Sequence, residues 1–167
     1  MQISNILKIA IPCILISIAN PASSAIIQLA ANIDGPQANA GAGTGSPGTG
    51  SATMTLDDTT NLFSWNIAWS GLTGSEVVAH FHGPALPNQN AGVQVGFSIV
   101  SPEIDSAILS ASQAADLLAG LWYINIHTTT AAGGEIRGQV QVVPIPAAAW
   151  LFGTALLGLG IAKRKKT

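Results

Sequence analysis

Cysteine and positive charge are scarce in this chain of 167 residues. The one cysteine, Cys13, lies in an apolar N-terminal run, so a domain that follows this run has neither a disulfide nor a thiol. The six Lys and Arg residues lie near the chain ends except Arg137, whereas all eight acidic residues lie between the ends. Phosphate binding needs clustered basic residues, which excludes nucleic acid as an expected partner and favours cations or basic surfaces.

The N-terminal 25 residues have the order of a secretory signal peptide. Residues 1–8 carry one Lys, residues 9–19 are almost wholly apolar, and Asn20 and Pro21 end the run. Small residues then precede a cleavage position after Ala25, where we expect signal peptidase to act. The alternative is an uncleaved anchor, but the apolar run is short for a bilayer.

The C-terminal segment predicts a transmembrane helix over residues 147–162. This stretch has no charged residue and would span about 24–26 Å as a helix, enough for a bilayer core with slight mismatch. Trp150 suits one membrane interface, and the basic residues 163–166 should remain cytoplasmic. The alternative, a core helix of a globular domain, does not explain four consecutive basic residues directly after it.

This segment resembles a family of bacterial sorting tails, the PEP-CTERM class, in its VPxP…WLFG variant. The resemblance covers residues 143–167 and rests on a short motif, an apolar helix and a basic end in that order. It implies recognition by an exosortase-type enzyme, cleavage near the prolines, and delivery to the cell surface or extracellular matrix. Pro144-Ile145-Pro146 replaces the strict Pro-Glu-Pro, so cleavage and persistent membrane anchoring both stay open. The sorting residues are Val143, Pro144, Pro146, Trp150, Lys163 and Arg164.

Residues 26–142 predict one antiparallel all-β domain, a sandwich or a barrel, with one short helix over 110–119. The helix has Ser110 or Ser112 as a cap and Gly120 after its end. Alternation of apolar and polar residues predicts the strands. They are expected at 25–33, 51–57, 61–69, 76–82, 92–99, 121–128 and 134–142.

The alternation also predicts which side chains face the core. We expect burial of Phe63, Trp65, Ile67 and Trp69, then of Trp122, Ile124 and Ile126, and finally of Ile136, Val140 and Val142. Gly138 interrupts the last set, and a glycine there should permit close backbone approach.

Three segments of this domain resemble the CHRD family, first described in chordin. They are His80-Phe-His82-Gly83, then Tyr123-Ile-Asn125-Ile-His127-Thr128, then Gly134-Glu-Ile-Arg-Gly-Gln139. The resemblance implies an immunoglobulin-like β structure without established catalytic activity. The proline that usually precedes the third motif is replaced here by Ala131-Ala132-Gly133, for which we expect only a changed turn.

The three histidines suggest a metal site. His80 and His82 share a strand face, and if the strand that carries His127 is a neighbour, three imidazoles converge. Such a set suits zinc or copper, with water or Glu76 as a fourth ligand. The alternative is that the histidines are framework residues that hydrogen-bond nearby loops. Arg137 likewise has two interpretations, a structural arginine that pairs with carboxylates or loop carbonyls, or a residue that captures an anion.

We therefore expect an exported, non-catalytic cell-surface or extracellular-matrix protein. No nucleophile–base pair is recognisable, so we do not expect an enzyme. The alternative function is a metal-binding module, with His80, His82 and His127 as ligands and zinc or copper as the only cofactor. Expected partners are signal peptidase, the sorting enzyme, the membrane, and exopolysaccharide or surface proteins.

Removal of Lys163, Arg164, Lys165 and Lys166 tests the tail. Because the positive end should fix the orientation of the apolar segment, the truncated chain should lose membrane retention or correct orientation. Cell fractionation combined with protease accessibility measures both. Unchanged sorting of the truncated chain would contradict the role assigned to the basic end.

Overall fold

The fold is that of a computed structural model, which describes residues 25–144. The predicted signal peptide and the predicted transmembrane helix over 147–162 lie outside this range, and they stay predictions. Among the described residues, no helix is long and apolar enough to cross a membrane.

Nine strands and one short α-helix make up the described domain. The strands are β1 Ile26–Asp34, β2 Thr49–Asp57, β3 Leu62–Ser70, β4 Glu76–His82, β5 Val93–Phe97, β6 Glu103–Ile108, β7 Tyr123–Thr128, β8 Ile136–Gln139 and β9 Gln141–Val142. The helix α1 spans Ala111–Leu118, and a short 3-10 turn spans Asn39–Gly41.

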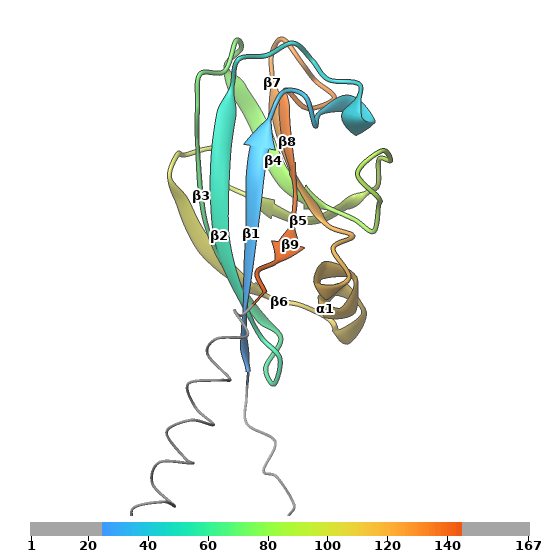
Figure 1. The fold of residues 1–167 in the computed structure, drawn as a ribbon. Coiled ribbons are helices and arrows are strands. Elements are labelled where there is room, and N and C mark those ends of the chain that lie inside the picture. Colours follow the sequence, from blue (N-terminus) through green and yellow to red (C-terminus); the bar gives the residue numbers. More distant parts are fainter. Residues whose placement is uncertain (1–24, 145–167) are drawn as a thin grey trace, which may run out of the picture.

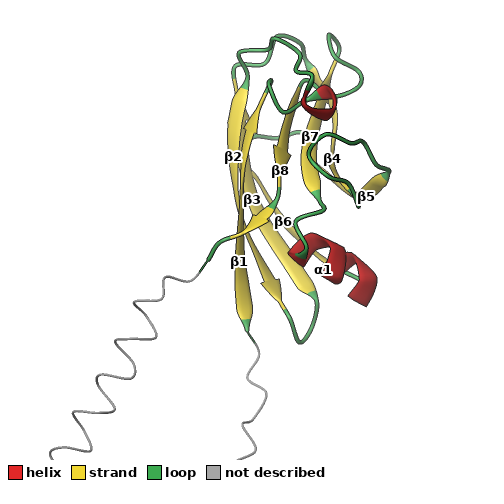
Figure 2. Ribbon diagram, turned by 45° about the vertical axis from the view of Figure 1, so that its right-hand side comes forward, coloured by secondary structure: helices red, strands yellow, loops and turns green. Residues whose placement is uncertain are grey.

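All strands belong to one antiparallel sheet with the order β5-β4-β7-β8-β1-β2-β3-β6, and β9 pairs with β1. The sheet curls until its two edge strands, β5 and β6, come close to each other. The result is a nearly closed, barrel-like sheet, with α1 on its outside between β6 and β7 in the chain (Figures 1 and 2). The predicted all-β antiparallel class with one helix is confirmed.

Apolar side chains of every second residue fill the inside of this sheet. The predicted inward residues of β3 are at most 6% exposed, and Trp122, Ile124 and Ile126 are fully buried. Aromatic rings meet at the centre, where Phe81 lies edge-on to Phe63 at 5.1 Å and to Trp65 at 5.2 Å between ring centroids. Such edge-to-face contacts stabilise a core beyond the area that they bury.

The short helix α1 lies in the connection between β6 and β7. Ser110 accepts a hydrogen bond from Gln113 N, and the Gln113 side chain accepts one from Ser110 N, so the helix begins with a complete capping box. Ala114 and Leu117 are its buried residues. The predicted helix and its Ser110 cap are confirmed.

The structure differs from the sequence-based expectation at two strands. β6 was not expected, because its exposed Ile104, Asp105 and Ser106 show no clear alternation. The single strand expected over 134–142 is divided at Val140, whose N–H donates to Trp122 O, and the chain then turns to pair with β1. Val142 is therefore 40% exposed, and its predicted burial is wrong.

Gly138 has the close backbone approach that the sequence predicts. A Cβ atom at this position would lie 2.5 Å from the carbonyl oxygen of Asn32 on β1, a backbone atom that cannot move away alone. Gly92, in contrast, has no atom within 4 Å of an added Cβ.

Gly138→Ala should accordingly lower the free energy of unfolding by about 1–3 kcal/mol, because the methyl group forces β8 away from β1. Gly92→Ala is the matched control and should not lower it. Urea unfolding, followed by tryptophan fluorescence, measures both. Equal unfolding midpoints for the two variants would contradict the packing argument.

Candidate metal centre

The three histidines of the chain come together on the outer face of two neighbouring strands. In the pairing of β4 with β7, His80 lies opposite Asn125 and Val78 lies opposite His127. Each of His80, His82 and His127 offers a ring nitrogen, and these atoms all lie within 4.8 Å of one another. The expected convergence of the imidazoles is confirmed, whereas metal binding stays a prediction.

Glu76 does not join the histidines. A β-bulge shifts the register between Glu76 and Val78, so that Glu76 pairs with Thr128 rather than with a residue on the histidine face. Its carboxylate accepts a hydrogen bond of 3.1 Å from Nε1 of Trp69, a buried residue of the core. Of the two fourth ligands expected from the sequence, Glu76 is therefore wrong, because the bulge reverses the alternation at this end of β4 and turns Glu76 away from the face of His80.

Backbone carbonyls hold two of the imidazoles in one tautomer. Nδ1 of His82 lies 3.0 Å from Ala91 O, and Nδ1 of His127 lies 2.8 Å from Ala132 O. A carbonyl oxygen only accepts, so both Nδ1 atoms carry the proton and both Nε2 atoms keep a lone pair. Metal-binding histidines are typically oriented by such contacts of the other ring nitrogen.

Two ring nitrogens of the cluster are buried without a partner. His80 Nδ1 and His82 Nε2 have no hydrogen bond among the described residues, although buried polar atoms are nearly always paired. The third imidazole has a partner at this nitrogen, since Asn125 Nδ2 donates to His127 Nε2 at 3.2 Å. His82 Nε2 is thus a buried lone pair without the hydrogen bond that a framework histidine would make, whereas no contact fixes the tautomer of His80.

The cluster favours neutral imidazoles. Burial lowers the pKa of His80, and the neighbouring His127 lowers it further. Burial also lowers the pKa of His82, together with His127, His80 and Arg137, against a smaller opposite effect of the hydrogen bond to Ala91. Neutral imidazole is the form that binds a metal ion, so the environment prepares these side chains for ligation.

The size of the cluster fits one ion after a small contraction. Zinc holds imidazole nitrogens at about 2.0–2.1 Å, which places two such nitrogens about 3.4 Å apart around a tetrahedral ion. The ring centroids are 5.4 Å apart for His80 and His82, and 5.8 Å apart for His82 and His127. The His80 ring, whose Nδ1 makes no hydrogen bond, is free to rotate and so to change its distances from the other two rings without moving the strands.

A stack of side chains supports His82 from the next two strands. The Tyr123 ring is parallel to the His82 ring, with centroids 5.1 Å apart, and the Arg137 guanidinium lies 3.5 Å from the Tyr123 centroid. Arg137 is buried and donates to Gln89 O at 2.8 Å and to Leu86 O at 3.2 Å. These bonds hold the loop after β4, including the Ala91 carbonyl that orients His82. Sequence reasoning offered loop carbonyls as partners of Arg137 and nearby loops as partners of the histidines, but it could not name which carbonyls these are.

A second polar cluster surrounds Glu135, which is 1% exposed. Its carboxylate accepts hydrogen bonds from six donors, which come from three segments of the chain. They are Ser46 Oγ, Thr73 N, Thr73 Oγ1, Gly74 N, Thr128 Oγ1 and Thr130 Oγ1. Burial alone would raise the pKa of Glu135, but the bonds from Ser46, Thr128 and Thr73 lower it to about 2. Glu135 is therefore a structural anion that joins loops, rather than a ligand for the histidine site.

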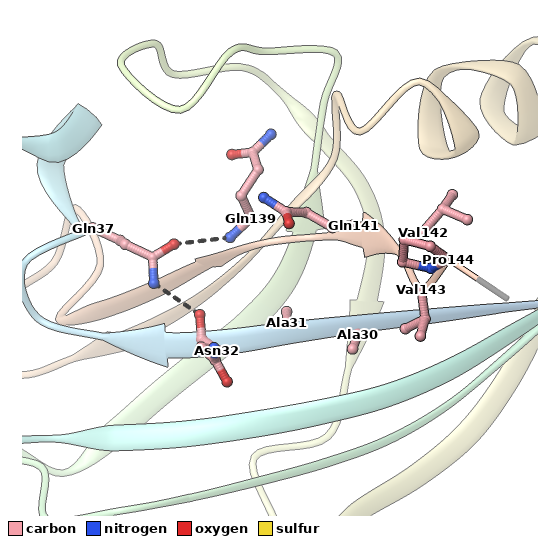
Figure 3. A pocket seen from close by; sticks show the side chains of 9 residues that line it. All are labelled: Ala30, Ala31, Asn32, Gln37, Gln139, Gln141, Val142, Val143 and Pro144. Carbon is pink, nitrogen blue, oxygen red and sulfur yellow. Dashed lines mark hydrogen bonds between the residues drawn. The ribbon is translucent and has the colours of Figure 1, made fainter. Parts of the chain in front are cut away.

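A groove of about 330 Å³ opens between β1 and the segment formed by β8 and β9 (Figure 3). The Gln37 side chain bridges one end of the groove, donating to Asn32 O at 2.8 Å and accepting from Gln139 N at 3.2 Å. The amide thus replaces a ladder hydrogen bond where the two strands separate. Among residues 25–144, no charged side chain lines this groove, and the histidines are not part of it.

The fold and the site define a class: a small, disulfide-free β-barrel-like domain with a histidine cluster on its outer face. The family model of the CHRD domain matches residues 29–140. The chain belongs to the CHRD domain family. Comparison with curated proteins found no match, and comparison with solved structures found none either.

Glu135 predicts how stability depends on acidity. Because its pKa is lowered from an ordinary 4.5 to about 2 in the folded state, the carboxylate stabilises the fold above pH 4.5. This contribution should be lost as the pH falls from 4.5 towards 2. Glu135→Gln turns an amide N–H towards donors, so it should lower the free energy of unfolding at pH 7 by about 1–3 kcal/mol.

The same substitution should flatten the acid dependence between pH 4.5 and about 2. Urea unfolding at a series of pH values measures both effects. Asp105→Asn, at an exposed position on the edge strand, is the control and should keep the acid dependence of the original chain. If Glu135→Gln retained it as well, another carboxylate would be responsible.

Proposed function

We propose that this chain is an exported, non-catalytic surface or extracellular-matrix protein whose CHRD domain binds one zinc or copper ion through His80, His82 and His127. The observation that carries the proposal is the pair of buried, unpartnered ring nitrogens in a cluster of three imidazoles. Imidazole is a common ligand of both metals. The ordered Nδ1 contacts and the lowered pKa values of His80 and His82 support it.

Export is proposed from the two ends of the sequence. Residues 1–25 have the pattern of a signal peptide, and residues 143–167 have that of a sorting tail with a membrane helix. Signal peptidase, an exosortase-type enzyme and the membrane are accordingly the proposed processing partners. Exopolysaccharide and surface proteins are the proposed partners after export, and the immunoglobulin-like relationship of the fold also rests on the resemblance alone.

The position of the cluster in the sheet suits such a protein. His80 lies in a row with Asn125 on β7, Arg137 on β8 and Asp34, the last residue of β1. At the other end of β1, Val143 N donates to Gln28 O, so both ends of the described chain lie near the beginning of this strand. A chain anchored beyond Pro144 would therefore present the histidines away from its anchor.

Metal content tests the proposal directly. The whole chain, purified without a histidine tag and exposed to zinc or copper, should retain about one ion per chain after desalting, measured by mass spectrometry. His80→Ala and His82→Ala should each weaken binding by at least about 100-fold, because loss of a ligand should exceed the effect of losing an outer partner.

Asn66→Ala is the matched control, since Asn66 is exposed on the outer face of β3, distant in the sheet from β4 and β7. It should retain the full metal content. Metal content far below one ion per chain, or equal content in all variants, would leave the histidines as framework residues.

A further inference from the structure

Among the described residues, no carboxylate belongs to the histidine cluster. Among residues 25–144, the group of ligand-type side chains at this place consists of His80, His82 and His127 alone. Glu76 is turned to the opposite face by the β-bulge, and Glu135 is occupied by its six donors. A divalent ion held here would keep its double positive charge on three neutral ligands.

A further positive charge lies behind the cluster. The Arg137 guanidinium contacts one face of the Tyr123 ring, and the neighbouring strand carries His82 parallel to that ring. Arg137 donates to carbonyl and amide oxygens of Leu86, Gln89, Asn90 and Gln139, none of which is charged. Partial burial weakens solvent screening, so the uncompensated charges act on one another more strongly than they would in water.

On the side of β5, the residue next to the His80 ring is a glycine. Gly96 lies opposite His80 in the pairing of β4 with β5, and it is exposed. A Cβ atom at Gly96 would lie 3.5 Å from Cδ2 of His80, which is ordinary contact. β5 thus has no side chain at the position opposite His80.

We infer that the metal ion bound by His80, His82 and His127 takes a small anion as its fourth ligand, on the side of the cluster next to Gly96. The inference rests on the proposed metal site. Three protein ligands leave a tetrahedral ion one position for an external ligand. Two positive charges on the ion, with Arg137 behind it, favour an anion over a neutral molecule in that position. The expected ligand is a small monoanion that binds through a single donor atom, in the space that the missing side chain of Gly96 leaves.

Cobalt(II) and azide test the inference. Cobalt(II) replaces zinc in histidine sites, and its visible absorption changes when a ligand joins it. The whole chain loaded with cobalt should change its spectrum on azide addition and saturate at one azide per cobalt. Perchlorate, a poorly coordinating anion at the same ionic strength, should leave the spectrum unchanged. A cobalt spectrum that responds to azide no more than to perchlorate would overturn the inference and leave the metal site intact.

Failure of the metal site has a different signature, because the chain would then bind no cobalt at all and both proposals would fall. A second variant tests the position. Gly96→Leu should retain cobalt and bind azide several-fold more weakly, since the leucine side chain covers this side of the cluster. Ala68→Leu, at an exposed position of β3, is the control and should bind azide as the original chain does. Equal azide affinity in the two variants would contradict binding beside Gly96.

Discussion

The antiparallel pairing of β4 with β7 is the constraint on which the fold and the candidate site both depend. Phe81, Ile124 and Ile126 are fully buried and direct one face of this strand pair into the core. Because successive side chains of a strand point to opposite faces, their burial places His80, His82 and His127 together on the other face. A register slip of one residue would bury the imidazoles and expose the aromatic core.

Buried polar atoms in this domain divide into paired and unpaired ones, and the division distinguishes the site from the framework. Arg137 and Glu135 each make several hydrogen bonds, and each holds loops together. In the part of the chain that the structure describes, the unpaired buried side-chain atoms are Trp65 Nε1, Trp122 Nε1, His80 Nδ1 and His82 Nε2. The indole nitrogens only donate and lie in the core, whereas the His82 nitrogen carries a lone pair on the outer face. A metal ion satisfies a lone pair, but it cannot satisfy an indole N–H.

The core shows how far local pattern predicts structure. The inward residues of β3, and the buried set around Trp122, were predicted from alternation, because these strands contain large apolar residues at every second position. Alternation failed for Val142, whose strand breaks at Val140, and for Glu76, which a bulge moves to the other face. It also missed β6, an edge strand that is mostly exposed and therefore has no inner face to mark it.

The sequence by itself determined that His80 and His82 share a face, that His127 faces with Asn125 and Tyr123, and that the core is aromatic. These are properties of a strand, whose side chains alternate whatever its neighbours are. Only the tertiary structure decided that the two strands are neighbours, that Glu76 is excluded, and that the carbonyls of Ala91 and Ala132 orient the rings. Those features arise from contacts between residues far apart in the chain. Neither a bulge nor a contact with a loop carbonyl can be recognised from the local sequence.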